Sequence, residues 1–445
     1  MNRTLILAAA LLATSAPALA APTLAAAPSR QEQVMIQTVD AEQGRHVDLL
    51  ERLVNQNSGS RNLDGVRKVR DMLAGEFQAL GFAVRWVDQA AVGRAGHLIA
   101  THKGKPGRKR LLLIGHLDTV FEPDHPFQKF ERLGPDKARG PGAADDKGGD
   151  VAMLAALRAM HKAGTLKDAN IEVVLTGDEE DAGLPLEAAR ADLVAAGKRA
   201  DVALDFEGLA RDGGKDMGSI ARRSAGGWKV TVTAKSGHSS GIFSASAGEG
   251  AIYPLARILT AFRTELPEPN LTFNVGLITG GASAEIAAND ANASAAGKSN
   301  IIPGVAIASG DLRALTPESI ARAEAKMREI VDRPFNGGSA TLTFDGKYPP
   351  MAPTAGNRAL LGKLNAVNAV LGLEPMGELD PLKRGAGDIS FVAADVDSLV
   401  GLGPASEGDH TSAEVVDLAS LWRQAKRAAL LMTRLSREPQ GRLTR

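Results

Sequence analysis

The sequence predicts an α/β protein: a largely parallel, mixed sheet covered by helices, with a second, two-layer domain inserted into it. Up to about residue 206, apolar strands alternate with amphipathic helices, which is typical of a parallel sheet buried on both faces. Near residue 217 the strands become one-sided and follow the order β-α-β-β-α-β, and from about residue 356 the first pattern returns. We therefore expect a larger domain in two parts, 21–216 and 349–445, and an inserted domain at 217–348.

The elements of the larger domain follow from the periodicity of its apolar residues. Helices are expected where these residues recur every three or four positions, and strands where they form short continuous runs. The expected helices are 46–56, 64–81, 148–164, 186–197 and 412–435, and the expected strands are 82–87, 97–102, 110–115, 171–177 and 202–206.

The inserted domain opens on "WKVTVTAK" (228–235), whose alternation of apolar and polar residues predicts a strand with one exposed face. Between its middle strands, the Ala/Gly/Asn-rich stretch 280–300 predicts a long loop or a short local helix. The remaining expected elements are strands 271–278, 304–315 and 339–348 and helices 249–266 and 317–335.

Composition narrows the classes of function. The 52 basic and 52 acidic residues give a formal net charge of +0, so we expect no nucleic-acid partner. Cysteine is absent, so the chain forms no disulfides and any metal site must use His, Asp and Glu.

Residues 1–20 have the pattern of a secretory signal peptide. Arg3 precedes the apolar stretch "LILAAALLA", and Ala18 and Ala20 stand at the positions that signal peptidase requires. A membrane anchor is the alternative, but the apolar run is shorter than the roughly 20 residues that span a bilayer. We therefore expect an exported bacterial protein, periplasmic or secreted, with no membrane contact once the signal is removed.

The strand in "LLLIGHLDTVF" (111–121) ends on His116 and Asp118. Two residues apart in extended geometry, both side chains lie on one face, so Asp118 can accept a hydrogen bond from His116 and orient it toward a metal. The alternative is a structural, buried His–Asp pair.

A glycine-rich turn, "RGPGAADDKGGD" (139–150), presents Asp145 and Asp146 just before a helix. It lacks the spacing of a nucleotide-binding loop, and its acidic pair would repel phosphate. A turn that delivers a carboxylate to a cation is the better interpretation.

Four consecutive acids, residues 178–181, follow the strand in "LTGDEEDAG" (175–183). Adjacent residues in an extended chain cannot share a face, which suggests that one is a metal ligand and its neighbour faces the reacting water. The alternative is a solvated acidic loop, the usual environment of a run of charges.

Two more motifs complete a thiol-free ligand set. Asp205 and Glu207 lie on one face of the strand end in "DVALDFEG" (201–208), and "GLGPASEGDHTSAE" (401–414) places His410 in a loop before the last helix. Carboxylates and imidazoles together suit borderline to hard ions such as Zn²⁺, Co²⁺ or Mn²⁺.

Together these motifs resemble the dizinc aminoacylase/carboxypeptidase peptidase family, the acetylornithine deacetylase, succinyl-diaminopimelate desuccinylase and glutamate carboxypeptidase type, with bacterial glutamate carboxypeptidases as the closest members. The likeness covers nearly all of the chain after the signal, through "LVNQNSGS", "GHLDTV", "PGAADDKGG", "TGDEEDAG", "DFEG", "GHSSG" and "GLGPASEGDHTSAE". It implies a fold of the zinc-exopeptidase type, in which the larger domain is catalytic, the inserted domain serves as a lid and for homodimerisation, and each subunit holds two Zn²⁺.

The resemblance also implies roles for individual residues. Asp145 would bridge both ions, with His116 and Glu207 on one and Glu180 and His410 on the other. Glu179 would be the general base and Asp118 the partner that orients His116. Asp205 shares a face with Glu207 and stays an alternative ligand.

Residues of the inserted domain and a late loop match the family's substrate-binding positions. His238 in "SGHSSG" corresponds to a histidine that reaches the active site across the dimer interface; the alternative is a turn histidine with no such role. Asn300 and Arg313 match positions that contact the substrate or its carboxylate, and a guanidinium suits a carboxylate. Gly385 or Gly387 in "RGAGDIS" would let the backbone approach the substrate.

The activity implied is that of an exported dizinc metallopeptidase of the carboxypeptidase type, a hydrolase that cleaves the amide bond to a C-terminal amino acid, with glutamate as the expected residue. A metal-bridging water would attack, with Glu179 as base. Small peptides or N-acyl amino acids are the expected substrates. The alternatives are an N-acyl-amino-acid deacylase or dipeptidase of the same family and, outside enzymes, a periplasmic binding protein with a degenerate metal site.

Overall fold

A six-stranded mixed sheet runs through the larger domain of the computed structural model, which describes residues 27–287 and 291–443. The strand order is β1-β2-β6-β3-β7-β20; β6, β3, β7 and β20 are parallel, whereas β1 and β2 pair antiparallel at one edge. The bounds are β1 (Ala83–Asp88), β2 (Gly96–His102), β3 (Arg110–His116), β6 (Asn170–Thr176), β7 (Val202–Asp205) and β20 (Asp397–Val400). The prediction of a largely parallel, mixed sheet is confirmed.

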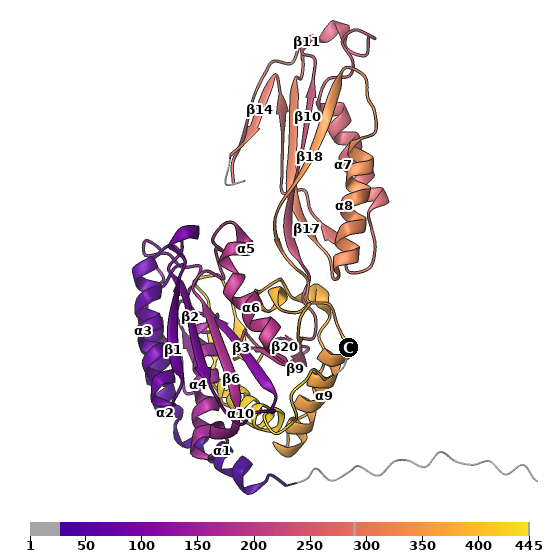
Figure 1. The fold of residues 1–445 in the computed structure, drawn as a ribbon. Coiled ribbons are helices and arrows are strands. Elements are labelled where there is room, and N and C mark those ends of the chain that lie inside the picture. The colour runs from indigo at the N-terminus through magenta and orange to yellow at the C-terminus, as the bar shows by residue number, and fades with distance from the viewer. Residues whose placement is uncertain (1–26, 288–290, 444–445) are drawn as a thin grey trace, which may run out of the picture.

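Helices cover both faces of this sheet (Figure 1). Successive residues of a strand point to opposite faces, so Leu111 and Leu113 lie in one apolar core and Leu112 and Ile114 lie in another. Helix α6 (Ala191–Arg199), preceded by the short α5 (Leu186–Ala189), covers the smaller core. The larger core is covered by α1 (Arg30–Ala41), α2 (Gln43–Asn55), α3 (Leu63–Ala79), α4 (Lys147–Lys162), α9 (Ala355–Val370) and α10 (Leu418–Leu435).

Two of the expected helices differ from the structure. The helix expected at 412–435 begins instead as strand β22 (Val415–Asp417), because its β-branched valines pair with β5 (Lys137–Arg139). Helix α10 starts only at Leu418, after the side chain of Asp417 caps it. The helix expected at 186–197 is broken at Arg190, whose side chain is buried.

The inserted domain is a sheet with two helices on one face. Its strand order is β12-β17-β10-β18, with β13 also paired to β17, and its core contains Trp228, Val230 and Val232. The bounds are β10 (Ala225–Ala234), α7 (Ile252–Glu265), β12 (Thr272–Phe273), β13 (Leu277–Gly281), β17 (Val305–Arg313), α8 (Pro317–Val331) and β18 (Gly338–Tyr348). The strand expected at 271–278 is thus two shorter strands.

The prediction for residues 280–300 was wrong, because this stretch forms a β-hairpin. Strands β14 (Ser283–Ile286) and β15 (Ala293–Ala296) pair antiparallel, with Ser283 opposite Ala296. Small alanine side chains predict no burial pattern of their own, but the backbone can still satisfy its hydrogen bonds by pairing with itself.

Short strands complete the described structure. A four-stranded group contains β4 (Glu131–Arg132), β5, β21 (Ser406–Glu407) and β22, and a three-stranded group contains β8 (Arg211–Asp212), β9 (Lys215–Gly218) and β19 (Gly377–Glu378). Strands β11 (Gly237–His238) and β16 (Ile301–Ile302) pair with each other.

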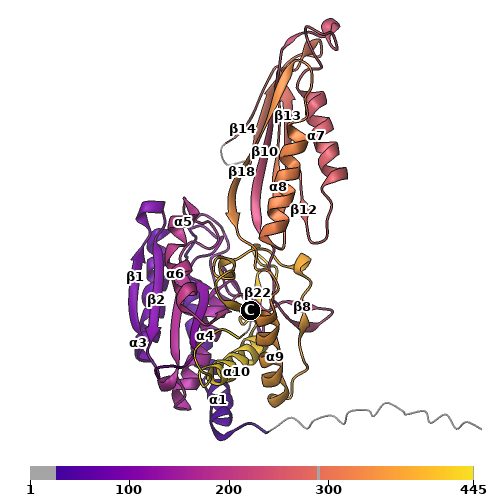
Figure 2. The same ribbon diagram turned by 45° about the vertical axis from the view of Figure 1, so that its right-hand side comes forward.

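The inserted domain projects from one end of the larger domain in both Figure 1 and Figure 2, and β11 lies near its far tip in Figure 1. The two connecting segments meet where Arg222 and Met351 exchange backbone hydrogen bonds of 2.9 Å. The signal peptide expected at residues 1–20 lies outside the described residues. Within the described residues, every helix is too short or too polar to cross a bilayer.

Candidate metal centre and active site

The candidate site lies where three neighbouring parallel strands of the larger sheet end. Strand β3 ends on His116, β6 ends on Thr176 just before the acidic loop, and β7 ends on Asp205. Open α/β sheets present their ligand-binding residues at this carboxyl edge, because parallel strands all end there.

Asp145 lies between the two histidines of the site. Its Oδ1 is 3.0 Å from Nε2 of His116, and its Oδ2 is 3.1 Å from Nε2 of His410. Each carboxylate oxygen therefore faces a different imidazole, which is the arrangement that a ligand shared by two ions requires.

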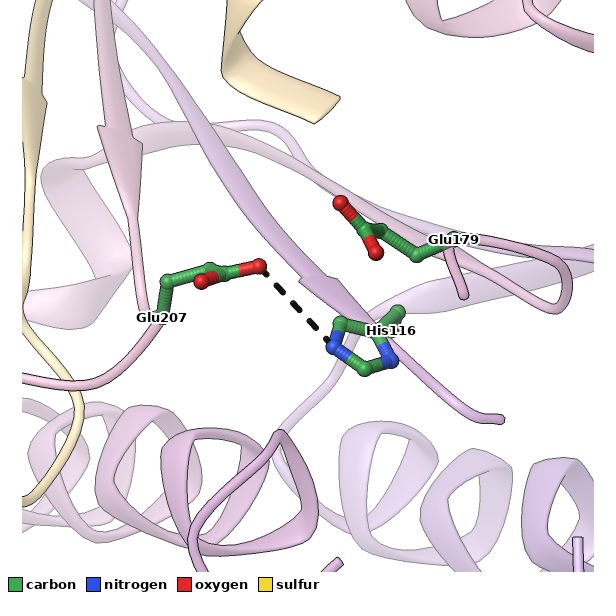
Figure 3. A group of neighbouring side chains, drawn as sticks. All are labelled: His116, Glu179 and Glu207. Atoms are coloured by element: carbon green, nitrogen blue, oxygen red, sulfur yellow. Dashed lines mark ion pairs between the residues drawn. The ribbon is translucent and has the colours of Figure 1, made fainter. Parts of the chain in front are cut away.

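Two glutamates extend this arrangement on either side. Oε2 of Glu180 lies 3.3 Å from Nε2 of His410, and Oε1 of Glu207 lies 4.0 Å from Nε2 of His116. Figure 3 shows Glu207 and His116 facing one another, with the carboxylate of Glu179 beside them.

Asp118 contacts both His116 and the acidic loop. It lies close to His116, with its carbonyl oxygen 3.1 Å and its Oδ1 3.3 Å from Nδ1 of the ring. The same carboxylate accepts hydrogen bonds from the hydroxyl of Ser60 at 2.6 Å and from the backbone nitrogens of Glu179 and Glu180 at 3.0 and 3.1 Å. Asp118 thus orients the histidine and the acidic loop together.

Burial and close charges shift the pKa values of the residues in this cluster. Burial alone would lower the pKa of His116, but hydrogen bonds with Asp118 and Asp145 outweigh it and raise the pKa well above its usual value. Burial would raise the pKa of Asp145, but hydrogen bonds with His116 and His410 hold it below its ordinary range. Burial first and then neighbouring carboxylates raise the pKa of Glu179 well above its usual value. Burial also raises the pKa of Glu180 to about 7.

The donor set fits a pair of divalent cations. Two ligand atoms held about 2.1 Å from one ion in tetrahedral geometry are roughly 3.4 Å apart. The carboxylate oxygens of Asp145 lie 3.0 Å from Nε2 of His116 and 3.1 Å from Nε2 of His410. Oε2 of Glu180 lies 3.3 Å from Nε2 of His410. All three separations are therefore close to this value. In addition, His116, Asp145 and Glu180 offer ligand atoms that lie within 4.8 Å of one another, as do His116, Glu179 and Glu207.

The geometry favours Glu207 over Asp205 as the ligand. The carboxylate of Asp205 is buried, accepts a hydrogen bond from the backbone of Glu207 at 3.3 Å, and lies 3.8 Å from the guanidinium of Arg222. Strand β7 ends at Asp205, so the chain turns and presents Glu207 toward His116 instead.

Two residues expected to contact substrate lie at the junction of the domains. The Nη1 atom of Arg313 is 3.6 Å from the position that a Cβ on Gly385 would occupy. At Gly387 a Cβ would lie 2.2 Å from Nη1 of the buried Arg222, so a larger residue there would have to displace that guanidinium. Gly385 has room by comparison, and its carbonyl accepts a hydrogen bond from Arg222 at 2.6 Å.

Two other expected residues lie far from this cluster in the same chain. His238 is in β11, near the outer tip of the inserted domain, and Asn300 lies beside it, with its carbonyl oxygen 3.0 Å from the nitrogen of Ser239. Both are exposed. Neither can reach the carboxylates of its own larger domain in this arrangement.

Sequence reasoning missed several residues that support the site. Glu414 is buried and accepts hydrogen bonds from the turn that carries Asp145, and Arg222 lies 3.5 Å from Glu207. Tyr348 donates a hydrogen bond to the carbonyl of Glu179, and Arg190 pairs with Asp178. Only Glu414 stood within a quoted motif; the others occupy positions that no local pattern distinguishes.

The chain is similar to known peptidases. The family model described as "Peptidase family M20/M25/M40" matches residues 112–434. Carboxypeptidase G2 of Pseudomonas sp. (strain RS-16) is 28% identical over 305 residues, which cover 68% of this chain and 67% of that protein.

Solved structures share the fold. A tripeptidase from Staphylococcus aureus superposes with a TM-score of 0.68 at 20% identity, over 89% of this chain and 99% of that one. The YXEP protein of Bacillus subtilis, described as a dinuclear metal binding peptidase from M20 family, superposes with a TM-score of 0.59 at 14% identity, over 89% of this chain and 99% of that one.

Proposed function

The chain belongs to peptidase family M20/M25/M40, and from that premise we propose that it cleaves the amide bond to a C-terminal amino acid by water attack, with Glu179 as general base. It is a metallopeptidase of the carboxypeptidase or dipeptidase type.

The observation that carries the proposal is the carboxylate of Asp145 between His116 and His410, with Glu180 and Glu207 on either side. We assign these five residues as ligands of two divalent ions, with zinc as the expected metal and Co²⁺ or Mn²⁺ as substitutes. When bound, such ions polarise the scissile carbonyl and lower the pKa of water.

The chain's own residues then move the proton. Glu179 stands beside His116 and Glu207, outside the ligand set proposed here. Its carboxylate can accept a proton from the attacking water and then pass it to the leaving amine. Asp118 holds the base in place through the backbone nitrogen of Glu179.

Substrate recognition is assigned to the domain junction. Arg313 has a guanidinium that is partly exposed next to Gly385, where a C-terminal carboxylate could pair with it. His238 and Asn300 are too distant in their own chain, so we propose that they act on the active site of a second copy in a homodimer formed through the inserted domains. His238 would there stabilise the oxyanion of the transition state.

Product analysis tests which bond is cleaved. The purified protein would be incubated with folyl-glutamate, with N-acetyl amino acids and with dipeptides, and the released amino acid would be identified. Glutamate released fastest from folyl-glutamate supports the carboxypeptidase assignment. Faster release of acetate supports the deacylase alternative, and cleavage of dipeptides alone supports a dipeptidase.

Two remaining points follow from the sequence. A binding protein with a degenerate metal site is disfavoured, because the family is one of peptidases and all five proposed ligands and the base are present.

The pattern of residues 1–20 supports export to the periplasm or beyond. Amino-terminal sequencing of the mature protein from fractionated cells tests this, and an uncleaved chain in the cytoplasm would refute it.

A further inference from the structure

The segment that returns from the inserted domain to the larger domain contacts the loop of the general base. Tyr348 is the last residue of β18, three residues before the bridge between Met351 and Arg222. Its hydroxyl donates a hydrogen bond of 3.1 Å to the backbone carbonyl of Glu179. This contact links residues that are 169 positions apart in the chain.

The hydroxyl of Tyr348 is held in place by its surroundings. Nη2 of Arg190 donates to it at 3.2 Å, so the single proton of the hydroxyl is left for Glu179. The ring packs edge-on against Phe391, with centroids 4.9 Å apart. Burial raises the pKa of Tyr348 far above its usual value, and the hydroxyl therefore stays protonated and can donate.

Arg190 is itself fixed on three sides. It donates to the carboxylate of Asp178 at 2.7 Å, to the carbonyl of Asp178 at 2.9 Å, and to the carboxylate of Asp388 at 2.7 Å. The second oxygen of Asp178 accepts from the backbone of Gly183 at 2.8 Å. The loop is thus closed around a rigid, buried guanidinium, directly next to Glu179.

The two peptide groups of Glu179 are held from different directions. Its N–H donates to Asp118 at 3.0 Å, and its carbonyl accepts from Tyr348 at 3.1 Å. Within the described residues, the carboxylate of Glu179 itself makes no hydrogen bond or ion pair, so its direction depends on the backbone that carries it.

We propose that Tyr348 is a positioning residue for Glu179: its hydroxyl fixes the peptide of the base and so aims the carboxylate at the reacting water. The proposal rests on the role of Glu179 given above. In this role Tyr348 acts through the base and not on the substrate.

The test is Tyr348→Phe, which removes the hydroxyl and keeps the ring against Phe391. Because small misplacements of a catalytic group reduce the rate steeply, we expect kcat to fall about tenfold while KM changes less than about twofold. The metal content should stay as in the wild type, and the lost hydrogen bond should lower Tm only slightly. The chain has two tyrosines, so Tyr253→Phe, at an exposed site, is the matched control and should leave kcat unchanged.

A double variant separates positioning from general support. In a Glu179→Gln background there is no base left to aim, so adding Tyr348→Phe should cause no further loss of kcat. An additive loss in the double variant, or an unchanged kcat in Tyr348→Phe alone, would overturn the positioning role and leave the proposed function intact. Full activity of Glu179→Gln would instead overturn the proposed function, and the positioning role with it.

Discussion

Glu414 holds Asp145 across a sequence separation of 269 residues: its Oε1 accepts a hydrogen bond of 3.3 Å from the backbone nitrogen of Asp145. The same buried carboxylate accepts from the nitrogens of Ala144 at 3.0 Å and Gly142 at 3.3 Å. The turn that carries the shared carboxylate is therefore anchored by a residue only four positions after His410.

Glu414→Ala should destabilise the protein and loosen its metal. It leaves three backbone N–H groups of the turn without their acceptor, which costs about 1–3 kcal/mol for each group that stays buried. Urea unfolding and the metal content after dialysis measure both effects. Glu407→Ala, in the same region but exposed, is the control and should change stability by less than about 0.5 kcal/mol. Unchanged stability and metal content in Glu414→Ala would contradict the anchoring role.

Chelation should abolish activity. The proposed ions polarise the scissile carbonyl and activate the attacking water, so the metal-free protein is expected to be inactive and to recover with two equivalents of zinc. Titration of zinc into the chelated protein, with activity and bound metal followed together, checks the stoichiometry. Full turnover in protein shown to be free of metal would refute the mechanism.

Glu179→Gln should keep both metal ions and lose most of the rate. The amide has the same size but cannot take a proton, and a general base contributes about 10²–10⁴-fold. Metal analysis by mass spectrometry and single-turnover kinetics measure the two properties separately. Loss of metal would move Glu179 into the ligand set, and wild-type turnover would remove it from the mechanism.

Mixed dimers test whether His238 acts on a partner subunit. His238→Ala and Glu179→Ala chains should each be nearly inactive as homodimers, whereas a heterodimer contains one site with both an intact base and an intact histidine. About half of the wild-type activity per heterodimer is expected from this count of intact sites. Differently tagged chains allow the heterodimer to be isolated, and no recovery in it would argue against action in trans.

His46 should make stability depend on pH. Burial lowers the pKa of His46 to about 4, below the model-peptide value of 6.5, so the unfolded chain binds a proton that the folded chain does not. Stability is then present above about pH 6.5 and is lost as the pH falls toward 4, by about 2 kcal/mol at pH 5.

The measurement compares urea unfolding of the wild type and His46→Leu at about pH 7 and pH 5. The variant should lose less stability than the wild type over this interval. His161→Gln, at an exposed position of α4, is the control and should follow the wild type. Parallel pH curves for the wild type and His46→Leu would contradict the assignment.

Much of the fold and of the site was predictable because local patterns carry that information. The run "LLLIG" before His116 is apolar on both faces, which predicts a buried strand of a parallel sheet, and the polar residues after such strands are expected at one edge. The carboxylates at Asp145, Glu179 and Glu180, taken together with the two histidines, then predicted a metal site near these strand ends.

Other features depended on residues that are distant in sequence. The start of α10 moved to Leu418 because Val415 and Val416 pair with β5, and residues 283–286 and 293–296 became strands because their backbones pair with each other. Neither pairing can be predicted from the spacing of apolar residues within the segment itself. That spacing indicates which face of one element is buried, but not which other segment pairs with it.

The sequence by itself therefore determined the class of fold, the domain order and the residue types that gather at the strand ends. Only the tertiary structure decided that Glu207 and not Asp205 faces His116, that Glu414 anchors Asp145, and that Tyr348 contacts Glu179. The physical reason is that each of these contacts joins polar groups from segments that are far apart in the chain. Which groups meet is determined by how those segments pack together.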